Sequence, residues 1–111
     1  MERSVNEYLD EDGYPTEEAL EKIENWSYND PVGWFKFIEN IWHLKEYCWD
    51  EKDVPHPWEE NTIVHQYLIS TAGWSGNEDI IRAMQENNIL WNIHWLQTRR
   101  GGHYIFDLKD N

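Results

Sequence analysis

The sequence contains little that would tie it to a membrane or to an oxidising compartment. Its 111 residues include one cysteine, Cys48, which can form neither an internal disulfide nor a CxxC metal site. No apolar run approaches the ~20 residues of a membrane-spanning helix. The first residues, MERSVNEYLDEDG, lack the apolar segment of a secretory signal. We therefore expect a soluble, cytoplasmic protein that does not bind membranes.

Basic side chains are also scarce. The chain has nine Lys and Arg against 22 Asp and Glu, a formal net charge of −13. Residues 1–60 hold 17 of the acidic and five of the basic side chains, so the excess lies in the first half. Phosphate contacts dominate nucleic-acid affinity and require Lys and Arg, so direct binding to nucleic acid is not expected. The charge favours solubility or attraction to a basic partner.

Apolar and aromatic residues, by contrast, are plentiful enough for a folded core. The chain is 40% hydrophobic and 15% aromatic, with eight tryptophans, whereas disordered chains are poor in aromatics. We expect one domain over residues 1–111. Ser4 and Glu7 have the spacing of a capping box. A glycine and a proline follow closely, however, and we expect residues 1–13 to be poorly ordered.

The first half predicts two helices. Thr16 is a suitable N-cap for a helix over 17–26, where apolar residues recur at helical spacing. Asp30 can cap a second helix over 31–44, which Pro31 would begin because proline is favoured at the first helical position. The short link between them predicts an αα-hairpin.

The second half predicts a small sheet. Residues 45–61 are ambiguous and suggest a brief strand at 47–49 followed by a loop. Further along, the pattern favours a strand at 62–70, a helix at 76–87 capped by Ser75 and Glu78, a strand at 89–98, a tight turn at 99–102 and a strand at 103–108. Asn87 and Asn88 would end the helix in the left-handed conformation.

The predicted fold class is α+β. An N-terminal helical hairpin packs on a three- or four-stranded mixed β-sheet, with one crossover helix and a C-terminal β-hairpin. If the strands at 62–70 and 89–98 run parallel, their carboxyl ends lie at one edge. Anions bind at such strand ends and at helix N-termini, and arginine offers them a bidentate fork. We therefore predict a ligand-binding site at Trp74, Ser75, Gly76, Asn77, Arg99, Arg100 and His103.

A purely structural interpretation of the same residues stays open. Ser75 could serve only as a cap, and the arginines could be solvated turn residues. His103 could act as a base towards Ser75 if the geometry allowed it, but no nucleophile elbow is present, and we assign no catalytic residue. His43 and Cys48 lack a metal-binding spacing, so we expect no metal site and no cofactor.

The tryptophans divide into two groups. Five fit the apolar stripes of the predicted elements and indicate core positions: Trp26, Trp34, Trp42, Trp91 and Trp95. Trp49, Trp58 and Trp74 fall in predicted loops. Loop tryptophans are frequent interface anchors, although they also cap the ends of small cores. We take Trp49 and Trp58 as candidate partner-binding residues.

Two segments carry a resemblance to a known group of proteins. Gly-Trp-Ser-Gly-Asn-Glu at 73–78 and Arg-Arg-Gly-Gly-His at 99–103 resemble a family of small uncharacterised bacterial and phage-type proteins, over about residues 14–108. The resemblance implies a small cytosolic protein of mobile-element origin. It implies no activity and therefore supplies no catalytic residue.

Two functions from different classes remain. The first is a non-enzymatic protein-interaction module whose acidic half binds a basic partner, as an inhibitor that mimics DNA or an immunity protein against a basic nuclease would. The alternative is a small-ligand-binding protein or enzyme that acts on a phosphate- or carboxylate-bearing molecule at the edge formed by Ser75, Arg99, Arg100 and His103.

Overall fold

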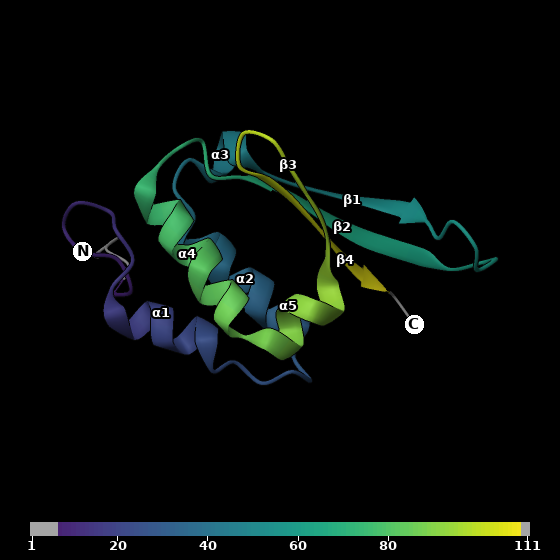
Figure 1. Cartoon of the computed structure of the whole chain (residues 1–111), viewed down its shortest axis with the longest axis horizontal. Coiled ribbons are helices and arrows are strands. Elements are labelled where there is room, and N and C mark those ends of the chain that lie inside the picture. The colour runs from purple at the N-terminus through teal and green to yellow at the C-terminus, as the bar shows by residue number, and fades with distance from the viewer. Residues whose placement is uncertain (1–6, 110–111) are drawn as a thin grey trace, which may run out of the picture.

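The computed structural model describes residues 7–109, which form helices on one face of a β-sheet (Figure 1). The helices are α1 (Glu17–Glu24), α2 (Pro31–Ile41), α3 (Lys45–Cys48), α4 (Ser75–Glu86) and α5 (Asn88–His94). The strands are β1 (Trp49–Pro55), β2 (Ile63–Ser70), β3 (Trp95–Arg99) and β4 (His103–Lys109). The α+β class, with N-terminal helices and a C-terminal hairpin, is confirmed.

The sheet has the order β1-β2-β4-β3, and every neighbouring pair is antiparallel. The predicted mixed sheet is therefore wrong, because β2 pairs with β4 and not with β3. Since β2 and β3 are both antiparallel to β4, they still run in the same direction. Their carboxyl ends consequently lie at one edge, where Ser70 and Arg99 both pair with His103.

The two predicted caps of the first half are present. Thr16 Oγ1 accepts a hydrogen bond from the Ala19 N–H at 3.2 Å, and Asp30 Oδ1 accepts one from the Gly33 N–H at 3.1 Å. Pro31 is the first residue of α2. Both helices end two or three residues earlier than predicted, which is common because helix ends are weakly specified by periodicity.

Two segments differ from the sequence prediction. Residues 50–55, which we expected to be a loop, belong to β1, because the charged stretch pairs along its whole length with β2. Of the predicted strand at 47–49, Tyr47 and Cys48 lie in α3. Residues 88–94 form α5 and not the start of a strand. Asn87 Oδ1 accepts from the Leu90 N–H at 3.3 Å and so starts this helix. With φ of −84°, Asn87 is not left-handed as predicted.

The core lies between the helices and the sheet. Phe35 of α2 stacks on Tyr67 of β2 at 4.0 Å and also contacts the rings of Trp34 and Phe106. Trp34 fixes α2 against α1, since its Nε1 donates to the Ile23 carbonyl at 3.0 Å. Among the helices of residues 7–109, none combines the length and apolar character needed to cross a lipid bilayer.

The first described residues form a turn ahead of α1. Residues 1–6, and with them Ser4 of the predicted capping box, lie outside the described residues. Residues 7–13, which we expected to be poorly ordered, include a turn in which Asp10 Oδ1 accepts from the Asp12 and Tyr14 N–H groups at 2.9 Å. Leu9 pairs with Pro15 across this turn.

A glycine substitution tests the contact that joins the two strand-end loops. Gly102 has φ of +80°, and a Cβ there would overlap Thr71 Oγ1. We expect Gly102→Ala to lower the free energy of unfolding by about 2–4 kcal/mol in urea titrations. Gly73 has φ of +74° with open space around its Cα, so Gly73→Ala should cost only about 1 kcal/mol. Equal losses would contradict the close approach.

Candidate functional site

The start of α4 is organised by Trp74 and not by a capping box. Ser75 is the first helical residue, and no side chain caps the helix. Ser75 Oγ instead lies 3.3 Å from the Tyr14 hydroxyl. The Trp74 ring stacks on His43 with ring centroids 4.2 Å apart and contacts the tilted ring of Tyr14 at 4.6 Å. A Cβ at Gly76 would overlap the Trp74 ring, so this glycine makes room for it.

Asn77 has a structural role. Its side chain is fully buried. Its Oδ1 accepts from the His43 N–H at 3.0 Å, and its Nδ2 donates to the carbonyls of His43 at 3.2 Å and Thr71 at 3.4 Å. One amide thus satisfies three backbone groups of the α2–α3 and β2–α4 connections. Both N–H donors of this amide are used, and its full burial keeps the amide out of reach of a ligand.

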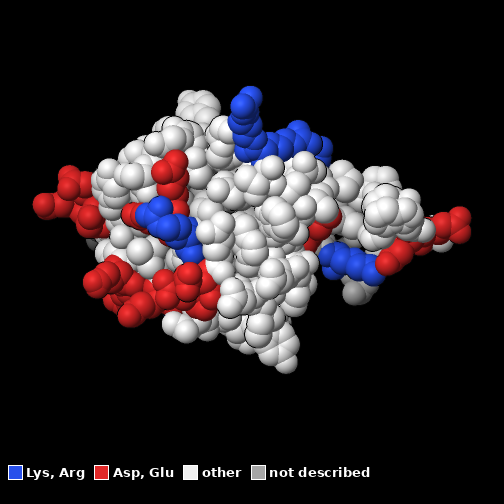
Figure 2. Space-filling view, viewed as in Figure 1, with Lys and Arg blue, Asp and Glu red and all other residues white. Residues whose placement is uncertain are grey.

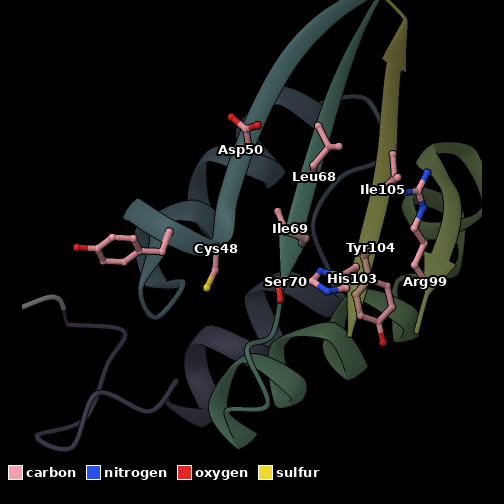
Figure 3. Close-up of a pocket in the computed structure, with 10 residues that line it drawn as sticks. Cys48, Asp50, Leu68, Ile69, Ser70, Arg99, His103, Tyr104 and Ile105 are labelled. Atoms are coloured by element: carbon pink, nitrogen blue, oxygen red, sulfur yellow. The ribbon is translucent and has the colours of Figure 1, made fainter. Parts of the chain in front are cut away.

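Arg99 and His103 lie in a separate pocket, on the sheet face opposite the helices (Figure 3). The pocket encloses about 380 Å³, and its polar lining includes Ser70 and Asp50. Ser70, His103 and Arg99 are consecutive cross-strand partners on β2, β4 and β3, so their side chains share one face. Arg99 Nε donates to Gln97 Oε1 at 3.2 Å.

The structure therefore divides the predicted site into two parts. Trp74, Ser75, Gly76 and Asn77 organise the start of α4. Arg99 and His103 line the pocket, whereas the exposed Arg100 does not. The two loops nevertheless meet, because the Thr71 N–H donates to the Gly102 carbonyl at 3.0 Å. Sequence periodicity placed the loops at one edge correctly, but it could not show which way each side chain points.

The two candidate partner-binding tryptophans have different environments. Trp49 begins β1, packs edge-on against Trp42 and Tyr67, and donates from Nε1 to Glu51 Oε2 at 2.8 Å. It belongs to the border of the core and not to a loop. Trp58 lies in the β1–β2 connection and is 85% exposed, which leaves its ring available to a partner.

Acidic side chains gather around α1. Figure 2 shows Asp and Glu atoms at the end of the molecule that carries α1 and the preceding loop, and Lys and Arg atoms near the β3–β4 turn. We define the α1 acidic patch as Glu11, Asp12, Glu17, Glu18, Glu21 and Glu24, all of which are exposed. Within residues 7–109, none of these six carboxylates forms an ion pair.

The nearest lysine does not neutralise this patch. Lys22 Nζ lies 5.6–5.9 Å from the ring centroids of Tyr8, Trp26 and Phe37. Cation–π attraction to the electron-rich ring faces stabilises this position. The carboxylates of the α1 acidic patch are therefore left facing solvent.

A second charged cluster lies on the helix-facing side of β1 and β2, and sequence analysis missed it. The two ring nitrogens of His65 lie 2.8 Å from Asp53 Oδ1 and 2.7 Å from Glu51 Oε1. Glu51 and Asp53 alternate along β1, and Asp53 pairs directly with His65. The sequence did contain a signal for this cluster, because acidic residues two positions apart lie on the same face of a strand. The signal was lost when residues 50–53 were predicted to form a loop.

The His65 cluster predicts a pH dependence of stability. Partial burial lowers the pKa of His65, but the hydrogen bonds and charges of Asp53 and Glu51 outweigh it and raise the pKa above its usual value. The stabilisation is therefore present below the ordinary histidine pKa and is lost as pH rises through the elevated one. We compare the free energy of unfolding of the wild type with that of His65→Gln. The advantage of the wild type should shrink as the pH rises from about 5.5 to about 8.

This difference isolates His65 from an opposing group. Burial lowers the pKa of His94, so the contribution of His94 is lost as pH falls and not as it rises. His94 is present in both proteins and cancels in the subtraction. A difference that is flat or that rises with pH would contradict the ion pairs of His65.

Comparison with known proteins gives no independent guide to this site. No protein family, curated protein or solved structure matches the chain. The resemblance carried by the motifs at 73–78 and 99–103 therefore stays a prediction.

Proposed function

We propose that this protein is a non-enzymatic interaction module that binds a basic protein through the α1 acidic patch. The observation that carries the proposal is a solvent-facing set of six carboxylates, none of which is paired with a cation within residues 7–109. An inhibitor or immunity-like protein that covers the basic surface of a nuclease would need such a patch.

Part of this patch carries like-charge repulsion along one face of α1. Glu17 and Glu21, four residues apart, and Glu21 and Glu24, three apart, are like-charge neighbours that destabilise a helix by a few tenths of a kcal/mol per pair. Cations on a partner would relieve this repulsion.

The patch is also held rigidly. Ala19 and Ile23 of α1 are fully buried, and Asn87 Nδ2 donates to the Ile23 carbonyl at 3.0 Å. The carboxylates therefore project from a fixed backbone. A preorganised surface loses less conformational entropy on binding than a flexible acidic tail would.

The proposal predicts which carboxylates a partner requires. We expect the wild-type protein to capture a basic protein from a host lysate at about 50 mM salt, with much weaker capture at about 300 mM, because exposed charges are screened. Replacing Glu17, Glu18, Glu21 and Glu24 together by Gln should weaken binding of the captured protein at least about tenfold. Titration calorimetry with the purified partner measures this change.

A charge-matched variant serves as the control. Glu46, Glu60, Glu78 and Glu86 are exposed and scattered over other elements. Replacing these four by Gln removes the same net charge, and binding should stay within about threefold of wild type. Equal losses in both variants would show non-specific attraction, and no partner at low salt would refute the proposed function.

A second candidate function follows from the pocket on the opposite face of the sheet. Arg99 and His103 could bind a phosphate- or carboxylate-bearing small molecule there, since both line the same 380 Å³ pocket. We expect such a ligand to raise the thermal midpoint in a concentration-dependent manner. Arg99→Ala should abolish the shift and Arg100→Ala should preserve it, because Arg100 does not line the pocket. A phosphate and nucleotide screen without a shift would remove this candidate.

A further inference from the structure

A cavity lies on the helix side of the sheet, between α2 and strands β1, β2 and β4. It encloses about 590 Å³, within the range of ordinary small-ligand sites. Val32 and Leu108 provide apolar walls, and Tyr67, Glu39 and Glu51 provide polar groups. None of these residues belongs to the α1 acidic patch or to the pocket of Arg99.

Two polar side chains that line this cavity have no hydrogen-bond or ion-pair partner among residues 7–109. Tyr67 is only 6% exposed, yet its hydroxyl makes no hydrogen bond with another residue of 7–109. The half-buried Glu39 carboxylate likewise forms no ion pair or hydrogen bond within that range. Buried polar groups normally have a hydrogen-bond partner, so a hydroxyl that lines a cavity without a protein partner, beside an unpaired carboxylate, offers two polar groups to a ligand.

The charges around the hydroxyl select the sign of that ligand. Burial and then the charges of Glu51 and Glu39 raise the pKa of Tyr67 to about 12. Both carboxylates are therefore close enough to act on the hydroxyl. The cavity lining also includes the cations Lys36 and Lys109, and Lys109 is paired with Glu59 outside the cavity. Glu51 is already occupied, because its two oxygens bind His65 and Trp49. Glu39 is left as the carboxylate available to a ligand.

We propose that this cavity binds an alkyl cation, a guanidinium or ammonium group on an aliphatic stem, with its charge at Glu39 and the Tyr67 hydroxyl. Val32 and Leu108 would contact the stem. Such a cation is either the side chain of an arginine or lysine on the basic partner or a free small molecule. In the first case the inference rests on the proposed function, and in the second case it does not.

Direct titration of the whole protein tests the chemistry. The probes are N-acetyl-arginine methylamide, its neutral isostere N-acetyl-citrulline methylamide, and butylguanidinium, followed by the NMR shifts of the Tyr67 ring. We expect both cations to bind and the citrulline derivative not to bind. Similar binding of the citrulline and arginine derivatives would overturn the proposal. If the capped arginine binds as well as butylguanidinium, the cavity accepts a side chain carried by a polypeptide. If only butylguanidinium binds, the cavity is restricted to a free cation.

Four substitutions locate the probe. Glu39→Gln and Tyr67→Phe should each weaken cation binding, by at least about tenfold for Glu39→Gln, and Tyr67→Phe keeps the ring that packs on Phe35. Glu46→Gln removes an exposed charge outside the cavity and should have no effect. Lys36 lines the same cavity and is exposed. Because its positive charge repels a cationic ligand, Lys36→Gln should strengthen binding.

The variants also define failure. Unchanged affinity in Glu39→Gln, or lost affinity in Lys36→Gln, would overturn the cation site. If only the proposed function is wrong, no protein is captured from the lysate, but the arginine probe still binds. Failure of the cavity proposal alone leaves partner capture, and its dependence on the α1 acidic patch, unchanged.

Discussion

Replacing Asn77 by Ala is expected to lower the free energy of unfolding by about 2–4 kcal/mol. The substitution leaves the N–H and C=O of His43 without their side-chain partner and removes a bond to the Thr71 carbonyl. It also leaves a cavity in a fully buried position. Urea denaturation followed by tryptophan fluorescence measures the change.

Asn88 provides the matched control for Asn77. It is the exposed first residue of α5, and Asn88→Ala should change the free energy of unfolding by no more than about 0.5 kcal/mol. If Asn77→Ala caused an equally small loss of stability, the buried amide would not hold the two connections together. Asn77 would then again be a candidate ligand-binding residue.

Phe35→Ala is expected to have the largest effect, a loss of about 3–5 kcal/mol. Its ring is fully buried and contacts four other rings, those of Trp34, Tyr67, His94 and Phe106. The substitution therefore opens a void where α2 meets β2 and β4. Small domains have a free energy of unfolding of only about 5–15 kcal/mol. The midpoint temperature of thermal unfolding should therefore fall strongly.

Removal of an exposed aromatic ring serves as the control for removal of the buried Phe35 ring. Tyr28 is 62% exposed in the α1–α2 connection. Tyr28→Ala should cost no more than about 0.5 kcal/mol. A Phe35→Ala protein as stable as Tyr28→Ala would contradict the packing of α2 on the sheet.

Local rules predicted those parts of the fold in which side chain and backbone interact within a few residues. Thr16, Asp30 and Pro31 begin helices because capping and proline geometry depend on near neighbours. The glycine turn after Arg99 follows from the same kind of reasoning, since Gly101 and Gly102 both have positive φ.

The secondary-structure predictions were wrong where contacts with residues distant in the sequence determine the local structure. Residues 49–55 are polar and contain turn-forming residues, yet pairing with β2 makes them a strand. The alternating segment after Asn87 becomes α5, because the Asn87 side chain caps it and donates to the carbonyls of Ile23 and Trp26. These contacts join residues more than 60 positions apart, which no local pattern contains.

The candidate site shows the same division. Sequence reasoning brought the loops after β2 and β3 to one edge, and the hydrogen bond between Thr71 and Gly102 bears this out. It could not show that Asn77 turns inward or that Arg99 and Arg100 point differently. It also missed His65 with Glu51 and Asp53, because cross-strand register is visible only in the folded sheet.

The central claim is that the α1 acidic patch is the binding face. Amide hydrogen exchange of the free protein and of its complex with the captured basic partner tests this most directly. We expect protection on binding to be concentrated in residues 10–24. Protection concentrated at residues 99–103, with residues 10–24 unchanged, would contradict it.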